Sequence, residues 1–216
     1  MNMQCFARWY KDEESGLCFR DQTILQFGDS WDLLANVILL NPGSAVPNDM
    51  EQQDKRLASK ALPYFISPKD GHYYNFTIDR LMRDVIQLYK QSYAGGVIKI
   101  YNLFNLKSQH SGQAIKQFKS HSNHAHMLTM QEDVCYGKKP VIIATGGNAF
   151  ADAILTTELK KYISLASTEQ LYALTKIAEH QFAIHKAEVN DVGLIESYHP
   201  SYTFKYGNIT QFQVGL

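Results

Sequence analysis

The stretch Asn36-Val37-Ile38-Leu39-Leu40-Asn41-Pro42-Gly43-Ser44-Ala45 decides the fold of this chain. Its run of four aliphatic residues with a β-branched start is typical of a strand buried on both faces of a sheet. Pro42 has no N–H to donate to a neighbouring strand and Gly43 permits a positive φ, so the strand cannot continue past Asn41. Ligands bind at the carboxyl ends of strands in open α/β sheets. We therefore expect Asn41 to project into a crevice, although Asn, Pro and Gly also form ordinary turns.

Length and composition suit one globular domain that spans residues 1–216. The chain is 45% hydrophobic and 19% charged, which is ordinary for a folded protein. A run of about 18 apolar residues, which a membrane span needs, does not occur, so we expect no membrane partner. The first residues lack the apolar core of a signal peptide, which indicates a cytoplasmic location.

Metal, disulfide and cofactor chemistry find little support in the sequence. Cys5, Cys18 and Cys135 are widely spaced and odd in number, which argues against a disulfide framework, zinc or an iron–sulfur cluster. The H-x-x-H-x-H run at residues 121–126 lies in polar Ser/Asn sequence without a carboxylate or Cys at ligand spacing, so a solvated surface is favoured over a metal site. Lys plus Arg equals Asp plus Glu at 21 each, so net charge gives no support for nucleic-acid binding, although a local basic face remains compatible with it. We expect no cofactor.

The remaining pattern predicts strands alternating with helices. Within residues 5–27, the apolar segments at residues 18–20 and 23–27 predict a hairpin or meander that leads into the central strand. An i, i+3, i+4 pattern predicts a helix over residues 78–89 with Thr77 as its N-cap. A short strand over residues 97–101 follows, which implies parallel pairing through a crossover. Further expected elements are strands at residues 141–144, 181–184 and 192–195, and helices at residues 127–134, 149–159 and 168–179. This order predicts a three-layer α/β/α fold with a central, mostly parallel sheet.

Polar residues follow several of these strands. Asn102 ends the strand at residues 97–101, and His199-Pro200 follows the last expected strand. Gly146 and Gly147 stand between a strand and a helix, an arrangement that cradles anions when the helix N–H groups are free, and that equally serves close packing. If these strands are parallel, their ends meet at one edge of the sheet.

Four short motifs in this order resemble the uracil-DNA glycosylase superfamily. Leu40-Asn41-Pro42-Gly43 is similar to the first motif of its mismatch-specific and single-strand-selective branches, and residues 96–102 are similar to the strand that ends in its base-reading Asn. Residues 141–146 resemble its third strand and glycine, and His199-Pro200-Ser201 matches the start of its catalytic histidine motif. Residues 39–45, 77–78 and 95–106 also resemble a bacterial and phage domain family of uncharacterised function, a distant branch of this fold.

The resemblance implies hydrolysis of the N-glycosidic bond to a damaged or deaminated nucleobase in DNA or a nucleotide. Asn41 would then position the water and His199 would stabilise the leaving base. Asn102 would read the edge of an everted base, with Pro42 and Gly43 beside it. One aromatic ring would stack on the base; the candidates are Tyr64, Phe65, Tyr73, Tyr74 and Phe76, of which we favour Phe65, Tyr74 and Phe76. Contacts to the flanking phosphates would come from Gly146, Gly147, Ser201 and Lys205.

The chain departs from the superfamily at three points. The strongest branch has Asp where this chain has Asn41, and an amide cannot act as a base. Gly43 stands where the uracil-specific branch has an aromatic ring. Tyr202-Thr203-Phe204 replaces the Pro and bulky aliphatic residue that usually wedge into the DNA helix.

The sequence is also compatible with functions other than glycosidic-bond hydrolysis. A non-catalytic module that binds DNA, single-stranded DNA or a nucleotide on the same fold would survive the loss of Asn41 and His199. A protein-binding domain would depend instead on the ring-rich segment at residues 64–76. A metal-dependent hydrolase has no supporting carboxylate and His cluster. The sequence indicates no oligomeric state.

Overall fold

The computed structural model describes residues 2–50, 57, 62–65, 73–90, 92–202 and 208–209. Its strands form one sheet in the order β4-β1-β2-β5-β3-β6-β7-β8-β9. The strands are β1 (Met3–Lys11), β2 (Cys18–Phe27), β3 (Leu33–Leu39), β4 (Tyr73–Phe76), β5 (Gly96–Asn102), β6 (Val141–Ile143), β7 (Leu171–Ala178), β8 (Gln181–Lys186) and β9 (Asn208–Ile209).

The sheet is mixed, and the prediction of a mostly parallel sheet is wrong. Four pairings are antiparallel: β1 with β2, β1 with β4, β2 with β5, and β7 with β8. The long β1–β2 hairpin pairs with β5 through β2 in antiparallel orientation, so antiparallel strands flank the parallel ones. The neighbours β5, β3, β6 and β7 pair in parallel. Their carboxyl ends therefore share one edge, as the site prediction requires.

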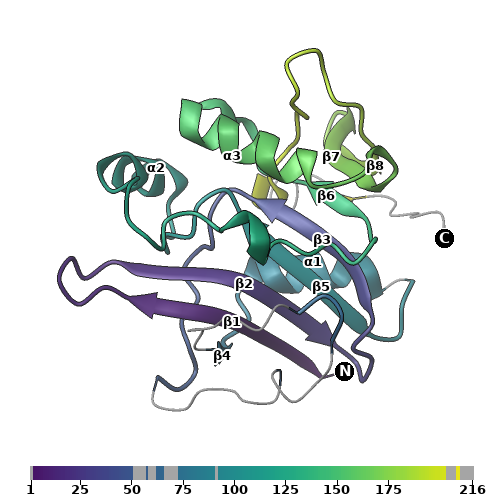
Figure 1. The fold of residues 1–216 in the computed structure, drawn as a ribbon. Helices are drawn as coiled ribbons and strands as arrows, with labels where there is room; N and C mark the ends of the chain where they lie inside the picture. Colours follow the sequence, from purple (N-terminus) through teal and green to yellow (C-terminus); the bar gives the residue numbers. More distant parts are fainter. Residues whose placement is uncertain are drawn as a thin grey trace.

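Helices cover both faces of the sheet (Figure 1). The helix α1 (Arg80–Lys90) packs Met82, Val85 and Ile86 on one face, in a core shared with β3, β5 and β6. On the other face lie α2 (Ser111–Ser120) and α3 (Ala153–Ser164), whose buried residues share a second core with the same strands. The α/β class with helices on both faces is confirmed.

The helix α1 lies where a helix was predicted, but its N-cap is a different residue. Asp79 Oδ1 accepts a hydrogen bond from the Met82 N–H at 2.9 Å, which satisfies one of the free donors at the helix start. The predicted cap Thr77 instead donates its hydroxyl to the Val46 carbonyl at 3.5 Å. The capping residue therefore lies two residues later, next to the first helical turn.

Three further predictions need correction. Residues 171–178 form β7 and not a helix, because Leu171 and Ala173 face one core while Tyr172 and Leu174 face the other, which is strand periodicity. Residues 192–195 form no strand. The helix expected at residues 127–134 is reduced to the 3-10 turn η1 (Gln131–Asp133), and the helix expected at residues 149–159 begins later, as α3, after the 3-10 turn η2 (Gly147–Phe150). A further 3-10 turn, η3 (Thr168–Gln170), comes directly before β7.

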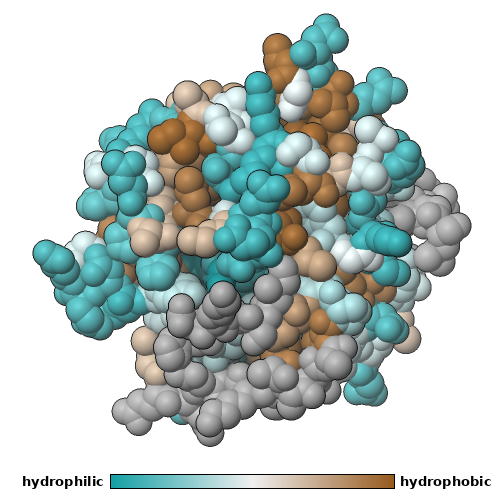
Figure 2. Space-filling view, in the orientation of Figure 1, coloured by the Kyte–Doolittle hydropathy of each residue, from teal (hydrophilic) through white to brown (hydrophobic). Residues whose placement is uncertain are grey.

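The surface mixes polar and apolar groups. Figure 2 shows hydrophobic side chains in scattered patches among hydrophilic ones. Among the described residues, no helix has the length and apolar character that crossing a membrane requires.

Candidate functional site

Asn41 and His199 line one cavity of about 420 Å³ at the carboxyl edge of the parallel strands. They are separated by 158 positions in the sequence, and the fold brings them together. Besides these two residues, the wall is formed by the loop after β3, the start of α1, Ser108 with Gln109, and Ser201. The size of the cavity is in the range of small-ligand sites.

The side chain of Asn41 is held in one orientation. Its Nδ2 group donates a hydrogen bond to the Ser108 carbonyl at 2.8 Å, and the residue is only 8% exposed. Because a carbonyl oxygen can only accept, the NH₂ group must face Ser108. Among the described residues no donor contacts Asn41 Oδ1, so this oxygen is left as an acceptor for a ligand or a water molecule.

Arg20 of β2 holds the loop after Asn41 in place. The buried guanidinium donates to the carbonyl oxygens of Pro42 and Ala45, and it lies 5.5 Å from the centre of the Phe76 ring. Burial lowers the pKa of Arg20, while the negative charge of Asp79 acts in the opposite direction. Arg20 thus holds the turn whose conformation presents Asn41, with Gly43 at a φ of +72°.

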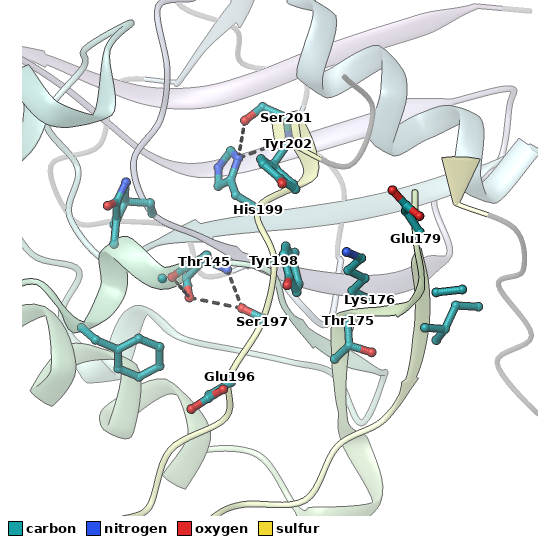
Figure 3. Close-up of a pocket in the computed structure, with 17 residues that line it drawn as sticks. Thr145, Thr175, Lys176, Glu179, Glu196, Ser197, Tyr198, His199, Ser201 and Tyr202 are labelled. Atoms are coloured by element: carbon teal, nitrogen blue, oxygen red, sulfur yellow. Dashed lines mark hydrogen bonds between the residues drawn. The ribbon is translucent and has the colours of Figure 1, made fainter. Parts of the chain in front are cut away.

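His199 presents a neutral imidazole whose tautomer is determined by Ser201. The half-buried ring accepts the Ser201 N–H at Nδ1 (3.3 Å), and the Ser201 hydroxyl lies 2.7 Å from the same nitrogen (Figure 3). Burial lowers the pKa of His199 from 6.5 to about 4. At neutral pH the proton therefore sits on Nε2, which leaves an N–H donor on the far side of the ring.

The backbone around His199 packs against the end of β6. The hydroxyl of Ser197 accepts the Thr145 N–H at 3.1 Å, and the Tyr198 N–H donates to Leu174 of β7 at 2.7 Å. Gly146 has a φ of +74°, and a Cβ placed on it would lie 3.0 Å from the Cβ of His199. The glycine therefore allows the histidine segment to approach β6 closely.

A larger groove of about 1120 Å³ meets the cavity at His199 and Ser201. It runs along Thr145 to Asn148 and the far end of β7, where Figure 3 shows Lys176 next to Tyr198 and Glu179 farther from Tyr198. Among the described residues, its charged lining side chains are Lys176, Glu179 and Glu196, so this part of the lining carries more negative than positive charge. This balance does not favour a phosphate backbone.

Asn102 lies at the end of β5 with its side chain buried. It is 1% exposed, and neither its Oδ1 nor its Nδ2 atom has a hydrogen-bond partner among the described residues. Strand alternation places it on the α1 side of the sheet, as for Ile98 and Ile100. It does not line the cavity. Buried amides without partners are uncommon and call for an explanation.

The predicted stacking rings do not line the cavity. Phe76 is 1% exposed and packs edge-on against Trp9. Phe65 packs against Tyr73, and Tyr74 packs at the margin of the core on the α1 side. In the part of the chain that the structure describes, Leu81 and Gly43 are the apolar elements of the cavity wall.

The predicted phosphate contacts are only partly assembled. Ser201 uses both its N–H and its hydroxyl on His199. The helix α3 after β6 starts at Ala153, and the Ile154 N–H at its start donates to Asp152 Oδ1 at 2.8 Å. A carboxylate at that position repels anions. Gly146 and Gly147 line the larger groove, and Lys205, like Thr203 and Phe204, lies outside the described residues.

The clustered histidines stack on aromatic rings. His126 lies parallel to Tyr10 with ring centres 4.0 Å apart, and His124 lies on Phe19 at 4.3 Å. Within the described ranges, no group of three His, Cys, Asp or Glu side chains is arranged to hold a metal ion.

Sequence reasoning missed Arg20, Ser108 and Asp79. Arg20 lies in a strand otherwise rich in buried residues, which is a weak signal for a structural role, and Ser108 acts through its backbone, which leaves no signal. Asp79 follows Thr77 at the expected start of a helix, where an acidic residue is a recognisable cap.

Comparison of the chain with protein-family models, curated proteins and solved structures gave no match.

Proposed function

We propose that this protein hydrolyses the N-glycosidic bond to a damaged or deaminated nucleobase in DNA or a nucleotide, on a uracil-DNA glycosylase-like fold. The observation that carries the proposal is the shared cavity of Asn41 and His199, two residues that belong to separate motifs. Their hydrogen bonds leave one acceptor and one donor for a ligand.

This pair matches the charges of the reaction. Cleavage passes through an oxocarbenium-like sugar and a departing base with developing negative charge. Asn41 Oδ1 would accept a hydrogen bond from the attacking water. The Nε2–H of neutral His199 would donate to the base carbonyl, where its hydrogen bond strengthens as charge develops.

The resemblance assigns the reading of the base to Asn102, which lies outside the cavity wall. Its amide has one donor and one acceptor, both buried without a partner among the described residues, and it faces the α1 side of the sheet. An everted base that reached it would satisfy both groups, which offsets the cost of burying them.

The charges also limit how a substrate binds. Asp79 and Asp84 line the cavity, with Arg80 as their neighbour. Two carboxylates repel phosphate, so we expect the base and its sugar to enter while the backbone stays outside. Few cations then contact phosphates, and affinity for DNA should fall only weakly with added salt.

Base release under single-turnover conditions tests the proposal. The substrates are oligonucleotides with uracil, hypoxanthine or xanthine, single- and double-stranded, in excess chelator. Wild type is compared with Asn41→Ala and His199→Ala, and His185→Ala, at an exposed position of β8, serves as the control. We expect abasic sites from wild type and the control, and a loss of about 100-fold or more in both cavity variants. Binding without base release would instead identify a non-catalytic nucleic-acid-binding module.

A further inference from the structure

The cavity contains a carboxylate to which the proposed hydrolysis assigns no chemical role. Asn41 can orient a water molecule, but an amide cannot take its proton. His199 already receives the Ser201 N–H at Nδ1, and its other nitrogen is a donor. A water-orienting group and a base-stabilising donor are therefore present, and a proton acceptor is still needed.

Asp79 lines the cavity with one oxygen fixed and the other open. Oδ1 accepts the Met82 N–H at 2.9 Å at the start of α1, which fixes the orientation of the half-buried carboxylate. Oδ2 points toward the loop after Asn41, because a Cβ placed on Gly43 would lie 3.5 Å from it. Among the described residues no hydrogen-bond donor is assigned to this oxygen.

The absence of a side chain on Gly43 leaves Asp79 Oδ2 accessible from the cavity. A Cβ at position 43 would already lie 3.5 Å from Asp79 Oδ2, so a larger side chain there would crowd this oxygen, whereas glycine leaves space beside it in the cavity wall. The other cavity carboxylate, Asp84, lies 3.8 Å from the Arg80 guanidinium and is one turn further along the helix. Asp79 is therefore the better placed proton acceptor.

We infer that Asp79 is the general base of this site, an inference that rests on the proposed function. The water held by Asn41 forms a bond from its oxygen to C1′ of the sugar and passes a proton to Asp79 Oδ2. The C1′–N bond breaks, and its electron pair leaves with the base, whose carbonyl oxygen is hydrogen-bonded by His199 Nε2–H. The products are the abasic sugar and the free base once the proton on Asp79 is returned to it through solvent.

Asp79→Asn separates this role from helix capping. Asn caps helices about as well as Asp, so the variant keeps the bond to Met82 but loses the proton acceptor. Asp152→Asn is the matched control, because Asp152 caps α3 through the same kind of bond and does not line the cavity. Single-turnover base release and urea unfolding are measured for wild type and both variants. We expect Asp79→Asn to lose about 100-fold or more in rate at nearly unchanged stability, and Asp152→Asn to keep the wild-type rate.

A small external acid provides the second readout. In Asp79→Ala, added formate can occupy the space of the missing carboxylate, and we expect the rate to rise with formate concentration, whereas His199→Ala should not respond. An Asp79→Asn rate within about threefold of wild type overturns the inference and leaves the proposed function intact. A rate loss in Asp79→Ala that formate does not restore overturns it in favour of a structural role. If wild type releases no base from any substrate, the proposed function itself fails, and the inference fails with it.

Discussion

Replacing Gly146 with alanine tests whether this glycine positions His199. Gly146 has a φ of +74°, and an L-residue pays about 1–2 kcal/mol in that region. The new Cβ would lie 3.0 Å from His199 Cβ and 3.3 Å from its backbone nitrogen. Such contacts force the histidine segment away, and overpacking of this kind costs about 1–3 kcal/mol.

The expected free energy of unfolding is therefore lower by about 2–5 kcal/mol, the range obtained by adding the cost of backbone strain to the cost of overpacking. The histidine would move by a few tenths of an ångström. Because a misplacement of about 1 Å can cost about 100-fold in rate, we expect the single-turnover rate to fall by about 3- to 10-fold.

Gly147→Ala is the matched control. Gly147 also lines the groove beside His199, but a Cβ on it would meet no atom within 4 Å. Urea unfolding gives the stability of each variant, and base release gives the rate. If Gly146→Ala is as stable and as fast as Gly147→Ala, the close approach of His199 to Gly146 does not matter and the argument is wrong.

Three further predictions concern the residues that hold the site. The pKa of His199 is about 4 in the folded protein and 6.5 in the unfolded chain, so the contribution of the neutral ring to the free energy of unfolding should be fully present above pH 6.5 and fall by at most about 3 kcal/mol as the pH drops toward 4. A His199 pKa of about 6 or above, measured by NMR, would refute this prediction. Arg20→Met leaves the Pro42 and Ala45 carbonyls without their donor, so urea unfolding should show a loss of about 2–4 kcal/mol, against less than about 0.5 kcal/mol for exposed Arg83→Met. Asn41→Asp places a carboxylate oxygen where Asn41 Nδ2 now lies 2.8 Å from the Ser108 carbonyl oxygen. The variant should lose about 1–3 kcal/mol in the free energy of unfolding and release base more slowly. A variant that is as stable as wild type and faster would contradict the assigned orientation of Asn41.

Local pattern alone determined much of the central sheet. The aliphatic run after Asn36, the strands that end in Asn102 and at residues 141–144, and the amphipathic helix over residues 78–89 follow from hydrophobic periodicity and strand-breaking residues. The hairpin or meander expected within residues 5–27 was misplaced, because residues 18–20 and 23–27 both lie in β2 and the strand that pairs with β2 is β1. The parallel pairing of β3 with β5 followed from the helical crossover between them.

Only the tertiary structure decided the rest, because it depends on contacts between distant residues. Residues 171–178 have spacing that suits either a helix or a strand, and pairing with β6 and β8 made them a strand. The antiparallel addition of β2 to β5 made the sheet mixed. Ser108 orients Asn41 and Arg20 holds its loop through backbone carbonyls, which carry no residue-specific signal. The sequence alone determined which side chains stand at strand ends, and folding decided that Asn41, His199 and Asp79 line one cavity while Phe65, Tyr74 and Phe76 pack elsewhere.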